Sequence, residues 1–326
     1  MDLLNQLFYG PNVALALLGG AGVLTMFLAL FASAPAAQVG RKVSGEEQRR
    51  TSLQHMIEQA NLPITAGEFL RTGAFLAVAT AVLGYVLLKR GLSRFDAAAV
   101  AATYGSVSAV TFITAVQYME SRGLVYGGHM AAAMALMESP AIVMAVVLAN
   151  MARQREGGAP AMHKPGLVKV LHESFTDGAQ LLLLGAMVIG LVTGESGQKA
   201  MQPFSGDLFK GMLAFFLLDM GLIAARNFGA LKGRSPWLVG YALCGPLVHA
   251  GLALGLAAVA GLSPGNAALL MVLAASASYI AVPAVVRVAI PEANPSLYFG
   301  MSLGLTFPFN ILLGIPLFVS IAHRVL

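Results

Sequence analysis

The sequence predicts an all-α polytopic membrane protein with about nine transmembrane helices, arranged as two inverted repeats that contain broken helices. Three observations lead to this fold class. The chain is 57% hydrophobic and only 11% charged, whereas soluble domains are about 25% charged. Its charge-free segments are long enough to cross a bilayer, and one Ser-x-Ser pattern occurs twice inside them. The composition therefore excludes soluble, disordered and disulfide-scaffold classes.

Charge-free windows of about 20 residues mark the expected crossings, because a helix rises about 1.5 Å per residue through a bilayer core of about 30 Å. The charge-free run 235–286 is too long for one crossing, and the turn residues 261–266 divide it into two. The other crossings are expected at 12–32, 72–88, 97–119, 129–151, 178–193, 211–225 and 297–320. No basic residue precedes the first window, so we expect a retained helix there rather than a signal peptide.

Two hydrophilic segments suggest how the chain is organised. Residues 41–72 are charged and amphipathic, with Leu53, Met56 and Ile57 at helical spacing. Residues 152–177 are basic and rich in turn formers, which is typical of a linker. We therefore expect an atypical N-terminal part at 1–72, a first repeat at 73–151, a cytoplasmic linker at 152–177 and a second repeat at 178–326.

The basic residues of the loops alternate between the two sides of the membrane from residue 89 onward. The positive-inside rule makes the richer side cytoplasmic, which places the linker in the cytoplasm and the C-terminus outside. It also explains the net charge of +5 without a nucleic-acid partner. The basic segment 41–72 contradicts the rule, because one crossing separates it from the basic loop at 89–96. The richer side holds Lys89, Arg90, Arg94, Arg153, Arg155, Lys164, Lys169, Arg226, Lys232, Arg234 and Arg287, and the other side holds Arg122, Lys199, Lys210 and Arg324.

The repeated Ser-x-Ser pattern indicates two equivalent crossings. Each pair of serines lies in an apolar run and is followed, after a similar distance, by a proline in the next crossing. The copies are offset by 168–170 residues and run in opposite directions, as inverted repeats do. The first copy contains Ser106, Ser108 and Pro140, and the second contains Ser276, Ser278 and Pro308.

A crossing broken near the bilayer centre offers particular chemistry. The helix N-terminus at the break presents N–H groups and a positive dipole end, which favour an anion. The serine hydroxyls add donors, and freed carbonyls can hold a cation such as sodium near Ser276 and Ser278. The alternative is that these serines are helix-packing residues, since Ser and Ala are common at helix contacts in membranes.

Carboxylates inside apolar crossings are the next candidates, because charge is costly in lipid. Glu138, beside a break expected at Ser139–Pro140, and Asp219 are candidate gating or coupling residues, together with Asn310 after Pro308. The alternative for each is a hydrogen-bonded helix-packing group. No nucleophilic triad, P-loop or dinucleotide fingerprint occurs, so no enzyme is expected.

Residues 73–326 resemble the sodium-dependent bicarbonate permeases of bacteria. The resemblance rests on AAAVAATYGSVSAVTF at 97–112, YGGHMAAAMALMESPAIV at 126–143, LLDMG at 217–221, ASASYIAVPAVVRVAIPEANPS at 275–296 and GLTFPFNILLGIPLF at 304–318. It implies two inverted five-helix repeats in the bacterial inner membrane, a homotrimer, and control by a P-II-like cytoplasmic protein. It also implies that the substrate anion contacts Gly105, Ser106, Ser108, Thr111, Ser276, Ser278 and Tyr279.

Two features depart from that family. Tyr279 and Ala281 stand where the cyanobacterial motif has an acidic residue and a further serine, so an expected sodium ligand is missing. The first 72 residues instead resemble tight-adherence and type II secretion F-domain membrane proteins. We therefore expect a junction near residues 72–75 and a first repeat that lacks two of its five helices.

The predicted function is secondary transport of a small, bicarbonate-like inorganic anion by alternating access, with sodium as the coupled ion. No cofactor is expected apart from that ion. One alternative is a membrane scaffold of a secretion or pilus-assembly system, which the N-terminal resemblance favours. The other is a non-transporting anion sensor. A scaffold has no need of polar breaks at corresponding places in two crossings, so the repeated serines favour a transporter or a sensor.

Overall fold

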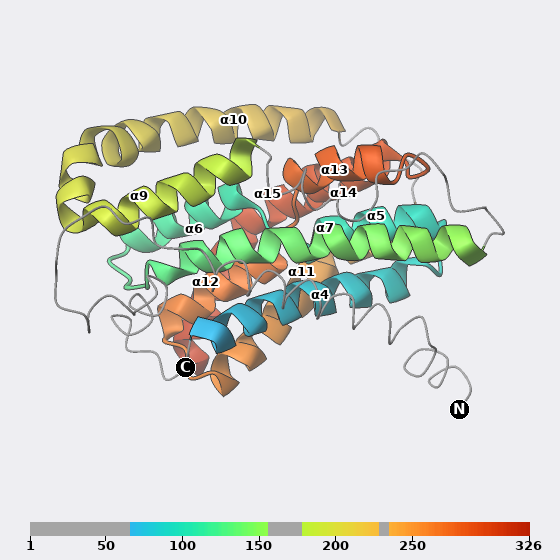
Figure 1. Ribbon diagram of the computed structural model, residues 1–326, viewed down its shortest axis with the longest axis horizontal. Coiled ribbons are helices and arrows are strands. Elements are labelled where there is room, and N and C mark those ends of the chain that lie inside the picture. The colour runs from blue at the N-terminus through green and yellow to red at the C-terminus, as the bar shows by residue number, and fades with distance from the viewer. Residues whose placement is uncertain (1–65, 156–177, 228–234) are drawn as a thin grey trace, which may run out of the picture.

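The computed structural model describes residues 66–155, 178–227 and 235–326, and within these ranges the chain folds as helices without a strand (Figure 1). The crossing expected at 12–32, the charged part of 41–72 before residue 66 and the linker after residue 155 lie outside the described residues.

The first half of the described chain contains one continuous helix, one broken crossing and one long helix. Their bounds are α4 (Ala66–Leu88), α5 (Arg94–Gly105), α6 (Ala109–Ser121) and α7 (His129–Arg155). Helix α4 starts six residues before the expected position, and α7 continues to Arg155, four residues into the expected linker.

The second half begins with a bent pair of helices and ends with a long crossing that contains π-helical segments. The bent pair is α9 (Gly178–Met201), η2 (Gln202–Leu208) and α10 (Phe209–Asn227), followed by α11 (Pro236–Val259), α12 (Pro264–Ala275) and α13 (Ala281–Ala289). The last crossing is α14 (Pro295–Met301), η4 (Ser302–Thr306), α15 (Phe307–Phe309), η5 (Asn310–Gly314) and α16 (Ile315–Val325).

Length and composition allow three of the described helical stretches to cross a membrane: Arg94–Ser121, Pro236–Val259 and Pro295–Val325. The bent pair Ser196–Gly206 and Phe209–Arg226 makes a fourth if it is counted as one span. The apolar part of α4 and the whole of α12 are shorter. The all-helical membrane fold is therefore observed, and the number of nine crossings stays a prediction.

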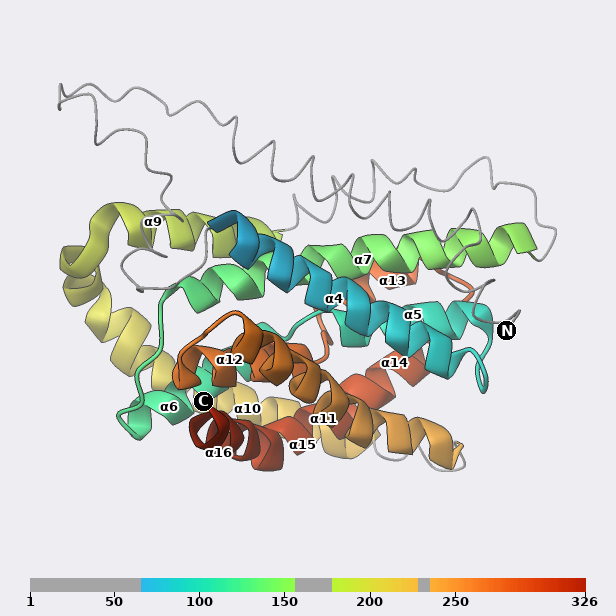
Figure 2. The same cartoon turned by 90° about the horizontal axis from the view of Figure 1, so that it is seen from below.

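Alanine-rich helices form the centre of the described structure. Helices α5 and α12 are each 12 residues long and are buried along most of their length. Small side chains let neighbouring helices approach closely, so α4 and α7 pack beside α5, and α11 and α16 pack beside α12 (Figure 2). Helices α9 and α10 lie along one side of this body and expose many large apolar side chains, as a lipid-facing surface does.

The break expected at Ser139–Pro140 is wrong, because α7 is continuous through Pro140. Proline removes one backbone hydrogen bond from a helix, but membrane helices tolerate this loss when neighbours satisfy the freed carbonyl. Around Pro308 the last crossing is also continuous, with π-helical turns on both sides. Such turns accommodate a proline without interrupting the helix.

Candidate functional site

The first break separates α5 from α6, and its two serines act as helix caps. Ser106 ends α5, and its N–H donates to the Ala102 carbonyl. Ser108 begins α6, and its Oγ accepts a hydrogen bond from the Thr111 N–H at 3.2 Å. Serine is favoured at such positions because its hydroxyl satisfies backbone groups that a helix end leaves unpaired.

The second break, between α12 and α13, repeats this arrangement. Ser276 ends α12, with its N–H donating to the Val272 carbonyl at 3.0 Å. The Oγ of Ser278 accepts from the Val282 N–H at 3.2 Å near the start of α13. In both breaks the first serine therefore ends a helix and the second accepts a backbone N–H of the next helix, although the N-cap position of α13 is Ile280 rather than Ser278.

The two breaks contact each other directly. The Ser108 N–H donates to Ser276 Oγ at 2.9 Å, and the Ser278 N–H donates to the Thr103 carbonyl at 2.9 Å. All four serines and Thr111 are buried. Segments about 170 residues apart thus form one buried centre made of hydroxyl and backbone groups.

The electrostatics of this centre come from helix ends rather than from charged side chains. Ser108 satisfies the Thr111 N–H, but the N–H groups of Ala109 and Val110 have no partner among the described residues. A helix N-terminus carries about half a positive elementary charge. Within the part of the chain that the structure describes, no three His, Cys, Asp or Glu side chains gather as they would around a metal ion.

Tyr279 and Asn310 both lie at the second break. The Tyr279 ring contacts that of Phe307 edge-on, with centroids 5.2 Å apart, and is 5% exposed. Asn310, in the last crossing, donates from Nδ2 to the Ala275 carbonyl at 2.8 Å. The Tyr279 hydroxyl and Asn310 Oδ1 are both buried without a hydrogen-bond partner among the described residues.

Gly105 contributes through packing. A Cβ on this residue would lie 2.5 Å from the Ala81 Cβ and 3.0 Å from the Ala77 carbonyl oxygen. Such a distance is shorter than any ordinary contact, so the absence of a side chain lets the end of α5 lie against α4. The structure thus gives Gly105 a packing role beside its expected contact with the anion.

The two candidate carboxylates lie in different surroundings. Glu138 is half-buried on α7, and its backbone carbonyl accepts a hydrogen bond from Ser106 Oγ at 3.2 Å. Glu138 therefore lies beside the first break. Asp219 is exposed on α10 and does not join the contacts between the breaks.

Sequence reasoning missed a second polar link, which joins α5 to the last crossing. The hydroxyls of Tyr104 and Thr306 lie 2.6 Å apart, and Thr306 Oγ1 donates to the Ala242 carbonyl at 2.7 Å. Both side chains are buried. Tyr104 lies inside the first serine motif, and Thr306 occupies the position in the second repeat that corresponds to Glu138 in the first. Both residues therefore lie in motifs that the sequence marks, but the sequence does not show that they contact each other.

Polar contacts also hold the outer ends of the broken crossings. At one end, Asp96 Oδ1 accepts from the Asn294 N–H at 2.7 Å. At the other end, Asn266 Oδ1 accepts from the Gly127 N–H at 2.7 Å. Each residue sits in the first turn of a 12-residue half-helix and binds the loop that follows the other broken crossing.

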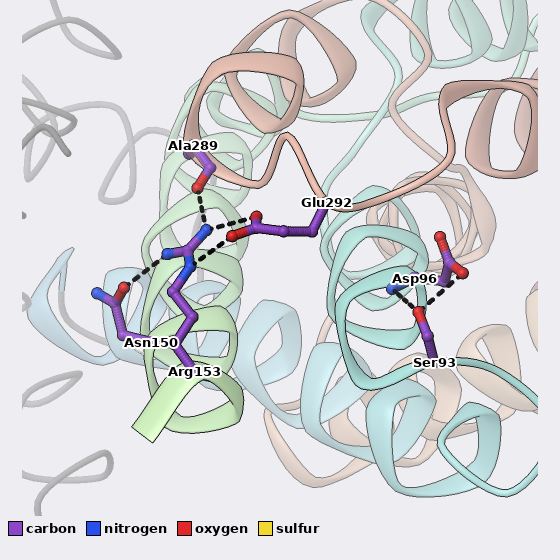
Figure 3. A network of polar contacts seen from close by, with 6 residues as sticks. All are labelled: Ser93, Asp96, Asn150, Arg153, Ala289 and Glu292. Carbon is purple, nitrogen blue, oxygen red and sulfur yellow. Dashed lines mark hydrogen bonds and ion pairs between the residues drawn. The ribbon is translucent and has the colours of Figure 1, made fainter. Parts of the chain in front are cut away.

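A charged network strengthens the Asp96 end (Figure 3). Arg153 donates from Nε and from one terminal nitrogen to the two carboxylate oxygens of Glu292, at 3.0 and 2.8 Å. It also donates to Asn150 Oδ1 at 2.8 Å and to the Ala289 carbonyl at 2.9 Å. This network joins the end of α7 to the end of α13.

The family described as the Na+-dependent bicarbonate transporter superfamily matches residues 55–323. The chain belongs to this superfamily. No curated protein matches the chain.

Membership of the superfamily confirms the resemblance found in the sequence and identifies a membrane transporter rather than an enzyme. The match begins at residue 55, ahead of the junction expected near 72–75. It gives the junction and the secretion-protein resemblance no support, and the expected loss of two helices falls on residues outside the described ranges.

Proposed function

We propose that this protein is a secondary transporter of a small inorganic anion of the bicarbonate type, which binds where the two broken crossings meet. The observation that carries the proposal is the pair of hydrogen bonds between the breaks, from the Ser108 N–H to Ser276 Oγ and from the Ser278 N–H to the Thr103 carbonyl. They join the two breaks through buried serines. The N-terminus of a helix, such as the start of α6 at this place, is suited to an anion.

The charge at this place supports a monovalent anion. Each helix N-terminus contributes about half a positive charge, so α6 and α13 together offset about one negative charge. The serine and threonine side chains that meet here are neutral donors. Removing a dianion from water would cost far more than these groups return, so sulfate and carbonate are expected to be poor substrates.

Alternating access by two inverted repeats belongs to the same proposal. Helices α5 and α12 begin at Arg94 and Pro264 and have equal length. The contacts of Asp96 and Asn266 correspond at opposite ends of the two crossings. This equivalence supports a pseudo-symmetric pair of states, one open to each side of the membrane.

Sodium coupling is proposed with ligands that carry no formal charge. The hydroxyls of Ser276 and Ser278 and the carbonyls freed at the second break are oxygen ligands of the kind that hold sodium in broken helices. A P-II-like regulator on the cytoplasmic side and a trimeric assembly in the bacterial inner membrane are further proposals that rest on the family resemblance alone. An external C-terminus is also proposed, and it rests on the charges of the loops.

Uptake of labelled bicarbonate into proteoliposomes, with and without a sodium gradient, tests the proposal. We expect Ser108→Leu and Ser278→Leu each to abolish uptake, because both remove a helix cap and fill the anion's place with apolar atoms. The matched control is Ser205→Leu, at an exposed serine of η2, which should keep uptake.

The outcomes separate the alternatives. Uptake that persists in both site variants would reject the proposed site. Bicarbonate binding by the wild type without uptake would instead favour the anion sensor. Uptake that does not respond to a sodium gradient would remove sodium from the mechanism.

A further inference from the structure

Tyr279 carries a hydroxyl group that the fold leaves without a partner. The side chain is 5% exposed, and its hydroxyl forms no hydrogen bond with any described residue. The Tyr279 ring packs against Val110, which follows the Ser108 cap in the other broken crossing. A buried tyrosine hydroxyl usually has a partner, because leaving a polar group dry and unpaired costs stability.

Apolar side chains hold the Tyr279 ring and close it off from water. Tyr279 forms a buried cluster with Leu303 and Phe307 of the last crossing. Partly buried side chains pack against this cluster: Val110 at the start of α6, Leu217, Met220 and Ile223 of α10, and Ile311. Tyr279 therefore lies between the broken crossings and α10. A hydrogen bond made in such dry surroundings is stronger than one made in water.

The start of α6 supplies matching donors. Val110 packs against the Tyr279 cluster, and its N–H and that of Ala109 have no partner among the described residues. The hydroxyl and the helix N-terminus thus place unused donors from two different crossings beside one apolar cluster. An anion with several acceptor oxygens would satisfy all of them.

We propose that the Tyr279 hydroxyl donates a hydrogen bond to the transported anion and thereby sets the affinity of the site for an oxyanion. This inference rests on the proposed transport function and assigns to the hydroxyl of Tyr279, which the resemblance places at the anion, the role of a donor at a position where the family motif has an acidic side chain. A phenol hydroxyl at this position favours a negative ligand, whereas a carboxylate would repel one.

Tyr279→Phe tests this role because it removes the hydroxyl and keeps the ring. In proteoliposomes we expect the KM for labelled bicarbonate to rise at least about tenfold, the effect of losing a hydrogen bond to a charged group. The maximal rate should stay within about twofold, since the ring still packs against Phe307. The matched control is Tyr298→Phe, which removes another buried unpartnered hydroxyl, in a different cluster, and should leave the KM unchanged.

Thermal melting of the purified full-length protein gives a second readout. Without anion, Tyr279→Phe should melt at the wild-type temperature or above it, because the substitution removes a buried unpaired donor. Bicarbonate should raise the melting temperature of the wild type and raise that of the variant less.

Three results would overturn the inference. An unchanged KM in Tyr279→Phe, with normal wild-type uptake, rejects the role of the hydroxyl and leaves the transport function standing. A lower melting temperature of the anion-free variant shows that the hydroxyl has a structural partner. A wild type that neither transports bicarbonate nor is stabilised by it rejects the proposed function, and this inference with it.

Discussion

Single residues at the breaks have separable roles, and Gly105 is the clearest example. It lies next to Ser106, but the space around its Cα is taken by α4, with the Cβ of Ala81 only 2.5 Å from where a Cβ of Gly105 would stand. The backbone carbonyl oxygen of Ala77 would also lie close, at 3.0 Å. Neither neighbour is a flexible side chain that could move away. Stability of the α4–α5 contact therefore depends on this glycine.

We predict that Gly105→Ala lowers stability by about 1–3 kcal/mol, the usual cost of overpacking a filled contact. The control is Gly240→Ala in α11, where a Cβ would meet nothing within 4 Å and where alanine favours the helix by up to about 1 kcal/mol. Melting temperatures of the two purified variants in detergent provide the comparison. Equal melting of Gly105→Ala and the wild type would mean that α4 is not packed here as described.

Among the elements, the half-helix α13 is unusually short, and its two ends are held in different ways. It has nine residues, and isolated helices of fewer than about 12 residues are marginal. Near its beginning, the Val282 N–H donates to Ser278 Oγ at the proposed anion site, and Arg153 donates to the carbonyl of Ala289 at its end. The ion pair of Arg153 with Glu292 fixes the following loop, and both side chains are only partly exposed (Figure 3).

Because Arg153 holds α13, Arg153→Gln should destabilise the protein by about 2 kcal/mol, the scale of hydrogen bonds to a charged group. The KM for the anion should also rise, because a displaced α13 would shift its N-terminal end, which lies beside Ser278 at the proposed anion site. Arg122→Gln is the control, because Arg122 is exposed and stacks on Tyr118 rather than joining the network of Arg153. If the double variant Arg153→Glu with Glu292→Arg recovers both stability and KM, the ion pair is the cause of the effect. If Arg153→Gln alters neither quantity, Arg153 does not hold α13 in place.

On the scale of the whole molecule, the two broken crossings are joined at three levels. Asp96 binds the Asn294 N–H at one end, the serines bind at the centre, and Asn266 binds the Gly127 N–H at the other end. The loops at 89–93 and 290–294 thus belong to one end of the described structure, and those at 122–128 and 261–263 belong to the other. The arrangement agrees with the alternation of basic residues along the chain.

The orientation of these two ends can be measured with single cysteines. In a Cys244→Ser background, which removes the exposed native thiol, we predict that Lys89→Cys is labelled only from the cytoplasmic side. Arg122→Cys should be labelled only from outside, because the positive-inside rule assigns the richer loops to the cytoplasm. A membrane-impermeant maleimide on intact cells distinguishes the two. Labelling of both cysteines from the same side would reject the proposed topology.

Much of the site could be predicted because it is encoded locally. The Ser-x-Ser spacing by itself predicts a helix end followed by a helix start, since serine caps act within three or four residues. Pro140 was misinterpreted as a break because its effect depends on neighbouring helices. Tyr104 and Thr306 were not paired because 202 residues separate them. Asp219 resembled a functional carboxylate in the sequence, yet α10 turns it outward.

The sequence alone determined that this protein lies in a bilayer, because so few of its residues are charged. It also determined that the polar groups at the breaks are neutral hydroxyl and backbone groups, because the breaks contain serine. The tertiary structure decided which of those groups meet. The Ser108 N–H reaches Ser276, and the Tyr279 hydroxyl is buried without a hydrogen-bond partner among the described residues, because the alanine-rich helices α5 and α12 are buried deeply enough to bring the two breaks together. Helix capping depends on residues that are close in the sequence, whereas the donor groups that remain free to bind an anion depend on contacts between distant segments.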